Sequence, residues 1–525
     1  MISLGCDKNR VDSEYMLAAL EGAGHTLVQD ENDAEVMIVN TCAFLSSARE
    51  ESIDVILGAA ELKKRGLKLL IVTGCLPQNH VAELKESLPE VDAFLGVREF
   101  DRIAEVIRGL SGLDEAGSAE YGGDAHANST AYQTAQALQE AEAPNAVMKQ
   151  AKPVTKVPKA PKPVTKEAKA PKPVTKEAKP PNAFAKQSEP QITEALHEAE
   201  ALNTLTKQAE PVTKVPKAPQ RVLTTQPHVA YLRVADGCSN ACTYCLIPRI
   251  RGRYISRPME EIVAEAETLV YGGVKELILV AQDVSAYGED LYGEVRLTEL
   301  IGRLSKLDVM WIRLLYCYPE RVDDALIAEI RDNPKIVKYL DAPFQHASDR
   351  ILSAMGRRFS RAEMEGLVSR LRGEIPGIVL RSSFIVGFPG ESRADFDSLC
   401  DFLREFKIEY AGFFAYSRED GTRAARFPGQ LNEREKQARL KTARQLQAGI
   451  LAEANAAYVG KRIPVIADGI DFDLQCFHGR HAGQTPDVDP RVLFTSPEIV
   501  ESGEVYLVEV ESAGIDLYGR VVEKL

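Results

Sequence analysis

The sequence of 525 residues has no long apolar run, and nowhere do eighteen apolar residues follow one another. This absence excludes a membrane-spanning helix of the usual length. The first ten residues, MISLGCDKNR, also lack the apolar stretch of a secretory signal, because Asp7 interrupts it. We therefore expect a cytoplasmic protein that has no membrane partner.

An excess of basic charge is missing as well. The chain has 64 Lys and Arg against 77 Asp and Glu, a formal net charge of −13. This net negative charge argues against a protein that binds nucleic acid over its whole surface. It is compatible with a basic protein partner. The nine cysteines, in a chain without an export signal, indicate metal or redox chemistry rather than disulfides.

Hydrophobic patterning divides the chain into four parts. Residues 1–110 and 225–457 alternate short apolar runs with amphipathic segments, which is typical of α/β structure with parallel strands. The first part is predicted to be a small parallel α/β domain. The second contains six such units and is predicted to be an open, partial (β/α)6 barrel of the TIM type. Residues 458–525 alternate apolar and polar residues in short runs, which predicts a small antiparallel β-barrel.

The remaining part, residues 111–224, is rich in Ala, Lys, Pro, Glu and Thr and nearly empty of aromatic residues. The pentapeptide KPVTK recurs there at Lys152, Lys162 and Lys172. Such a composition buries too little apolar surface to offset the entropy of ordering, so we predict a disordered linker. Its lysines could contact RNA phosphates. We favour the alternative interpretation, that this segment is a solvated spacer.

Three cysteines follow the first predicted barrel strand in the run DGCSNACTYC: Cys238, Cys242 and Cys245. Three thiolates at this CxxxCxxC spacing can hold three irons of a 4Fe–4S cluster. The fourth iron then keeps an open coordination position, where chemistry takes place. A zinc knuckle with a distant fourth ligand is the alternative.

Three further cysteines each end one of the first three predicted strands: Cys6, Cys42 and Cys75. The carboxyl ends of parallel strands meet at one edge of a sheet, where ligands bind. The positions of these cysteines therefore predict a second three-thiolate site. The alternative is three separate cysteines buried in the core.

The CxxxCxxC run resembles that of the radical S-adenosylmethionine (SAM) enzymes, and Tyr244 precedes its last cysteine as an aromatic residue does in that family. Outside the linker, the chain resembles the methylthiotransferases, which combine an N-terminal cluster domain, a radical SAM barrel and a C-terminal TRAM domain. That family has two main substrate classes: a tRNA adenosine beside the anticodon, and an aspartate of ribosomal protein uS12 in the small ribosomal subunit.

Two strings are similar to the protein-modifying group. SLGCDKNRVDSE at residues 3–14 resembles SLGCPKNxVDSE, with Asp7 in place of the usual proline, and VNTCAFLSSAREESID at residues 39–54 resembles VNTCGFIxxAxxESID. The tRNA-modifying group more typically shows GCQMN around the first cysteine. Residues 460–525 hold twelve acidic and six basic residues, a formal charge of −6, which suits a basic ribosomal protein better than RNA.

The resemblance implies two 4Fe–4S clusters, one on each set of three cysteines, with SAM bound at the barrel cluster. Cleavage of SAM would give a 5′-deoxyadenosyl radical that removes hydrogen from the β-carbon of the aspartate, and the second cluster would carry the sulfur to be inserted. Cofactors supply this chemistry, so we assign no catalytic side chain beyond the cluster ligands. A low-potential electron donor such as flavodoxin and a monomeric enzyme are expected.

Contacts to SAM are predicted at Tyr244, against the adenine, and at two strand ends of the barrel. Gln282 and Asp283 follow the second barrel strand, where ordinary strand-end capping is the alternative. Gly387 and Gly390 belong to the run GFPGE after the fifth strand, where glycine lets the backbone approach a ligand closely. A tRNA methylthiotransferase and a non-catalytic Fe–S binding protein remain as alternative functions. The other cysteines are interpreted as structural: Cys317, Cys400 and Cys476.

Overall fold

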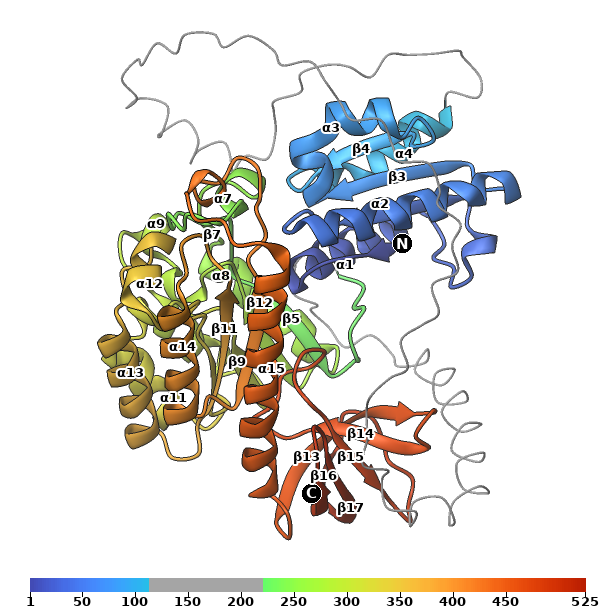
Figure 1. The fold of residues 1–525 in the computed structure, drawn as a ribbon. Helices are drawn as coiled ribbons and strands as arrows, with labels where there is room; N and C mark the ends of the chain where they lie inside the picture. The colour runs from blue at the N-terminus through green and yellow to red at the C-terminus, as the bar shows by residue number, and fades with distance from the viewer. Residues whose placement is uncertain (113–220) are drawn as a thin grey trace, which may run out of the picture. The chain divides into compact units, whose positions relative to one another are not determined.

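A computed structural model of the chain describes residues 1–112 and 221–525 (Figure 1). Almost all of the predicted linker, with its KPVTK repeats, lies outside the described residues. Arg221 and Thr224, at the end of the segment that we assign to the linker, are hydrogen-bonded to Glu14. In the part of the chain that the structure describes, no helix is both long and apolar enough to cross a membrane.

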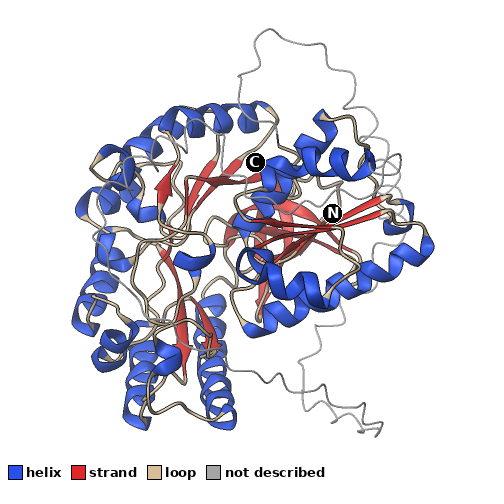
Figure 2. Cartoon of the chain, turned by 90° about the horizontal axis from the view of Figure 1, so that it is seen from above, coloured by secondary structure: helices blue, strands red, loops and turns tan. Residues whose placement is uncertain are grey.

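The N-terminal domain is a four-stranded parallel sheet with the order β1-β2-β3-β4. Its strands lie between helices (Figures 1 and 2). Successive strand residues point to opposite faces, so Val39 packs with α2 and α3, whereas Ile38 packs with α1 and α4. The predicted α/β domain is confirmed. Its elements are β1 (Ile2–Ser3), α1 (Asp7–Gly22), β2 (Val36–Thr41), α2 (Ser46–Glu61), β3 (Leu69–Gly74), α3 (Cys75–Ser87), β4 (Ala93–Gly96) and α4 (Ile103–Ser111).

The central domain has six parallel strands in two sheets of three, with the orders β5-β8-β9 and β10-β11-β12. A single parallel bridge, Ile312 to Ile336, connects β9 with the segment before β10. The expected open, partial barrel is therefore confirmed. Its strands are β5 (Val229–Arg233), β8 (Glu276–Val280), β9 (Trp311–Leu314), β10 (Tyr339–Asp341), β11 (Val379–Val386) and β12 (Tyr410–Ala415).

Helices follow these strands, and their apolar faces form the largest buried cluster with the strands. A short antiparallel pair, β6 (Ala235–Asp236) with β7 (Ile255–Ser256), closes the loop after β5. The helices of the central domain are α7 (Ile247–Ile250), α8 (Met259–Tyr271), α9 (Glu289–Tyr292), α10 (Leu297–Leu304), α11 (Asp324–Asp332), α12 (Asp349–Met355), α13 (Arg361–Glu374), α14 (Arg393–Phe406) and α15 (Glu433–Ala456).

The C-terminal domain is a closed five-stranded barrel with the order β13-β14-β15-β17-β16. Four of its strand pairs are antiparallel, as predicted, but β15 and β17 are parallel. That pairing closes the barrel between strands that are not consecutive, which alternation of apolar residues alone does not reveal. The strands are β13 (Arg462–Asp471), β14 (Cys476–Arg480), β15 (Val492–Thr495), β16 (Val505–Ala513) and β17 (Leu517–Lys524).

A buried ion-pair cluster connects α1, the segment before β5, and α8. Glu265 is 1% exposed and accepts from Arg221 at 2.6 Å, Arg257 at 2.7 Å and the Tyr15 hydroxyl at 2.8 Å. Burial alone would raise the pKa of Glu265, but the charges of Arg257 and Arg221 outweigh it and lower this pKa to about 2. The ionised carboxylate is therefore part of the folded structure.

Because the pKa of Glu265 is lower in the folded chain than in the unfolded chain, its stabilising contribution is complete above about pH 4.5 and is lost as the pH falls toward 2. We expect Glu265→Gln to lower the free energy of unfolding at pH 7 by on the order of 3 kcal/mol and to flatten its decline below pH 4.5. Denaturant unfolding at several pH values measures both effects. Glu267→Gln is the matched control, because Glu267 lies exposed on the same helix, and an equal decline in both variants would contradict the prediction.

Candidate functional site

The three N-terminal cysteines lie together at the carboxyl edge of the sheet. Cys6 directly precedes α1, Cys42 directly follows β2, and Cys75 begins α3 after β3. Gly5 has φ +98°, and a Cβ there would lie 3.3 Å from the Cys42 sulfur, so the first loop passes against the second. Burial, together with smaller effects of the neighbouring Cys6 and Cys42, raises the pKa of Cys75 to about 12. The predicted grouping of these thiols is thus present in the fold.

Asn9, on the first turn of α1, holds the three cysteine-bearing loops. Its amide donates to the Leu4 carbonyl at 3.0 Å, beside Cys6, and to the Thr41 carbonyl at 2.9 Å, beside Cys42. The Cys75 thiol lies 3.7 Å from its Oδ1. One buried side chain therefore contacts all three loops.

The barrel cysteines share a single loop between β6 and α7. The Cys238 amide donates to the Gly252 carbonyl at 3.0 Å, and the Cys245 sulfur accepts from the Ile247 amide at 3.4 Å. Burial, together with smaller effects of Cys242 and Cys238, raises the pKa of Cys245 to about 12. These thiols are close enough to influence one another, as a shared ligand set requires.

Among the described residues, no group of three or more His, Cys, Asp or Glu side chains is placed to hold a single metal ion. A zinc knuckle needs its ligands to converge on one ion, whereas each cysteine of a 4Fe–4S cluster binds a different iron. Two sets of three neighbouring cysteines, each set one thiolate short of a fully ligated cluster, fit the cluster better than the knuckle.

The residues expected to bind SAM differ in whether their side chains already have partners within the protein. Tyr244 contacts Phe388 of the GFPGE run edge-to-face, with ring centroids 6.5 Å apart, so the cysteine loop and this run are neighbours. Gln282 donates to Asp236 at 3.0 Å, and its enclosed Oε1 has no partner. Among the described residues, that oxygen therefore has an unused acceptor position, although neighbouring atoms enclose it. The structure therefore retains Tyr244 and Gln282 as candidates.

Asp283 is used within the protein. Its carboxylate accepts from Ser285 at 2.6 Å and from Asn240 of the cysteine loop at 3.0 Å. These bonds favour the capping alternative, with the addition that Asp283 orients the loop that carries Cys238. Burial raises the pKa of Asp283, against the lowering effect of these hydrogen bonds.

The two candidate glycines are required by the backbone and by α15. Gly387 has φ +74°, and a Cβ there would lie 2.6 Å from Lys436 Cγ; Gly390 has φ +80°. Positive φ disfavours other residues at both positions. The close neighbour of Gly387 is a helix side chain, so close approach to a ligand is not the only reason for glycine.

Sequence patterns did not identify two arginines beside the cysteines. Arg357 is 6% exposed, stacks on Tyr318 at 4.3 Å, and leaves Nε and Nη1 without partners. Burial raises the pKa of Tyr244, and the positive charge of Arg357 acts against this rise, so the guanidinium lies near the barrel site. Arg251 is 2% exposed and donates to Asn9 at 2.5 Å. Neither has a sequence signal, because the partners of each are brought near only by the fold.

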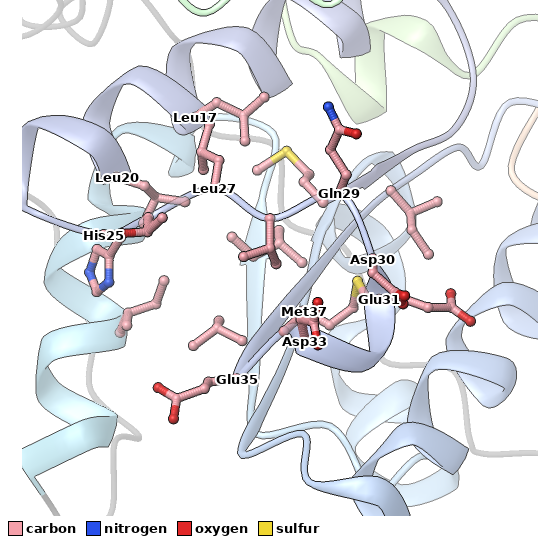
Figure 3. Close-up of a pocket in the computed structure, with 18 of the residues that line it drawn as sticks. Leu17, Leu20, His25, Leu27, Gln29, Asp30, Glu31, Asp33, Glu35 and Met37 are labelled. Carbon is pink, nitrogen blue, oxygen red and sulfur yellow. The ribbon is translucent and has the colours of Figure 1, made fainter.

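A cavity of about 600 Å³ lies elsewhere, along the amino-terminal half of β2. Figure 3 shows Leu17, Leu20, Leu27 and Met37 around it, with acidic side chains such as Glu35 nearby. None of the six candidate cysteines lines this cavity. The cysteines follow the opposite ends of the strands, so we do not assign the cavity to the site.

Family models match three separate stretches of the chain. Residues 1–96 match the family described as "Uncharacterized protein family UPF0004", residues 232–403 match the radical SAM superfamily, and residues 459–522 match the TRAM domain. A solved structure of the radical SAM methyltransferase TsrM from Kitasatospora setae has a TM-score of 0.46 and 15% identity, covering 79% of this chain and 72% of that one.

Several curated relatives match over the whole length. The ribosomal protein uS12 methylthiotransferase RimO of Acetivibrio thermocellus is 39% identical, with 100% of this chain and 98% of the relative covered. The protein of the same name from Geotalea uraniireducens is 38% identical, with 99% and 98% covered. The chain therefore belongs to the RimO family of ribosomal protein uS12 methylthiotransferases, which are radical SAM enzymes.

Proposed function

We propose that this enzyme adds a methylthio group to the β-carbon of an aspartate in ribosomal protein uS12. The observation that carries the proposal is identity near 38% along the full chain to relatives that bear this activity in their names. Two sets of three neighbouring cysteines in one chain add chemical support, because the reaction needs both a source of radicals and a carrier of sulfur.

We assign Cys238, Cys242 and Cys245 to the SAM-binding 4Fe–4S cluster and the N-terminal set to a second cluster. Bound there, the clusters and SAM supply electron transfer, a carbon-centred radical and the inserted methylthio group. The protein's part is to bind and orient these groups and to hold the substrate. No side chain is required to act as acid or base.

The side chains around the barrel cysteines have matching roles. Tyr244 offers a ring to the adenine, and Gln282, whose Oε1 has no partner among the described residues, remains a candidate contact to SAM. Arg357, whose guanidinium lies near Tyr244, places a positive charge beside the site that we assign to SAM. Asp283 fixes the cysteine loop through Asn240. Together these contacts orient SAM without contributing a proton.

The ion pairs of the TRAM barrel argue against the tRNA alternative. Of its six basic residues, four are paired with carboxylates, which leaves few cations to neutralise phosphates. A barrel with net charge −6 complements a basic ribosomal protein. The paired residues are Arg480, Arg491, Arg520 and Lys524.

We further propose a cytoplasmic, monomeric enzyme that receives electrons from a low-potential donor such as flavodoxin. The substrate supports the location, because the small ribosomal subunit is assembled in the cytoplasm. The donor follows from the chemistry, since the barrel cluster must be reduced in every turnover. Residues 113–220 remain a proposed linker between the cluster domain and the barrel.

Mass spectrometry of uS12 from cells lacking this gene, beside complemented cells, tests the function. We expect a uS12 peptide from the deletion to be lighter by about 46 Da, the mass of SCH₂ gained when a methylthio group replaces hydrogen. Complementation should restore the heavier peptide. An unchanged uS12 peptide would overturn the proposal, and a methylthio group missing from tRNA nucleosides instead would establish the alternative.

A further inference from the structure

A lysine ammonium lies beside the N-terminal cysteines without a hydrogen bond. Lys8 is on the first turn of α1, two residues after Cys6, and its side chain is 7% exposed. Among the described residues, its nearest carboxylate oxygen is Asp7 Oδ2 at 3.8 Å, beyond hydrogen-bond distance. Its Nζ instead lies 3.4 Å from the centre of the Tyr316 ring. Burying a cation in this way is costly unless something supplies acceptors.

The neighbouring groups do not supply them. Asp7 Oδ2 is enclosed and has no partner in the described part of the chain, while Oδ1 lies 3.5 Å from the Tyr316 hydroxyl. The Lys8 side chain remains 7% exposed, so solvent reaches a small part of it. Among the described residues, the ammonium thus has the Tyr316 ring as its close contact and its hydrogen-bond donors unused.

The ring of Tyr316 is held beside the ammonium by its own backbone and by β10. Tyr316 follows β9 and has φ +60°, a conformation that residues other than glycine rarely adopt. Its amide donates to Asp341 Oδ2 at 3.1 Å, at the end of β10. Strained backbone of this kind is kept where the surrounding structure and function require it. The ring of Tyr316 is thereby fixed under Lys8.

Two nearby arginines are already paired. Arg381 on β11 contacts Asp341 at 3.4 Å and Asp489 at 3.3 Å, and Arg251 contacts Asp12 at 3.0 Å. In the described part of the chain, Lys8 differs from both because it has no carboxylate within hydrogen-bond distance. An added carboxylate would satisfy two of its three N–H donors and remove the cost of burial.

We propose that Lys8 binds the side-chain carboxylate of the target aspartate of uS12. This inference rests on the proposed function. The β-carbon that receives the methylthio group is bonded directly to the carboxylate carbon, so anchoring the carboxylate fixes the position of the reacting carbon. Lys8 does so two residues from Cys6, beside the site that we assign to the sulfur-carrying cluster. Lys8 thereby selects an acidic residue over its amide.

The test compares two substrates on two enzymes. We would reconstitute the wild-type enzyme and Lys8→Met anaerobically and load each with S-adenosylhomocysteine. Each enzyme is then titrated with two substrates: native uS12, and uS12 in which the target aspartate is changed to asparagine. Wild type should bind uS12 roughly 10- to 100-fold more tightly than the asparagine form. Lys8→Met should bind both forms with similar, weaker affinity, and Lys8→Arg should keep part of the preference. Lys64→Met is the control, because Lys64 is an exposed lysine of the same domain.

Two results would overturn the assignment. An undiminished preference for the aspartate form in Lys8→Met would show that its carboxylate binds elsewhere. Fewer irons per chain in Lys8→Met than in wild type would make Lys8 a counter-charge of the cluster instead. Failure of the proposed function is distinct from both, because the wild-type enzyme would then leave uS12 unmodified whatever residue stands at position 8.

Discussion

Cys42→Ala abolishes methylthiolation of uS12 but preserves SAM cleavage, whereas Cys242→Ala abolishes both: this is the result we expect from the two cysteine sites. Cys42 belongs to the N-terminal set and Cys242 to the barrel set, and the two sets lie on different domains. A cluster held by three thiolates has no spare protein ligand, so loss of one thiolate removes the cluster. The two reactions should therefore separate according to the site that is damaged.

Anaerobic assays that measure 5′-deoxyadenosine by chromatography and modified uS12 by mass spectrometry distinguish the two losses. Iron analysis should give about eight irons per chain in wild type and about four in either variant. Cys400→Ala is the matched control, since Cys400 is a buried cysteine of α14 with 3% exposure and should keep all the iron. SAM cleavage that disappears in Cys42→Ala while four irons remain would contradict the assignment of separate roles.

The positions of the cysteines in the fold could be predicted from the sequence because each depends on local information. A strand pattern followed by a cysteine places the thiol at the carboxyl edge of a parallel sheet, and this held for Cys6, Cys42 and Cys75. The spacing of Cys238, Cys242 and Cys245 on one loop fixes their proximity directly. The strand pattern before a cysteine and the spacing between cysteines can both be read from a short stretch of sequence.

The groups that hold these sites could not be predicted in the same way. Asn9 contacts three loops and Arg251 contacts two domains, and their partners are distant in sequence. The sequence shows only that α1 carries several polar residues. Without the fold, these residues cannot be distinguished from those of a helix face exposed to solvent. Asp283 shows the opposite case, because its position at a strand end was predictable and its bonds to Ser285 and Asn240 were not.

Arg251 is the residue whose loss should most disturb the relation between the two cysteine sites. Its guanidinium donates to Asp236 at 3.2 Å, in β6 before Cys238, and to Asn9 at 2.5 Å and Asp12 at 3.0 Å, in α1 after Cys6. Removing one member of a buried ion-pair network leaves the other charges uncompensated. We expect Arg251→Gln to lower the free energy of unfolding by about 3–5 kcal/mol.

We expect Arg251→Gln to uncouple SAM cleavage from methylthiolation of uS12 rather than to abolish both reactions. Because Arg251 ties the helix behind Cys6 to the loop that carries Cys238, a weakened network should let the radical form without reaching the substrate in the right position. The number of SAM molecules cleaved per uS12 methylthiolated should therefore rise in Arg251→Gln, and Arg251→Lys should restore part of the stability. Arg393→Gln is the control, because its pair with Asp397 is exposed and worth about 0.5 kcal/mol or less. An Arg251→Gln enzyme with the wild-type ratio of SAM cleaved to product would show that this contact stabilises the fold without coupling the two sites.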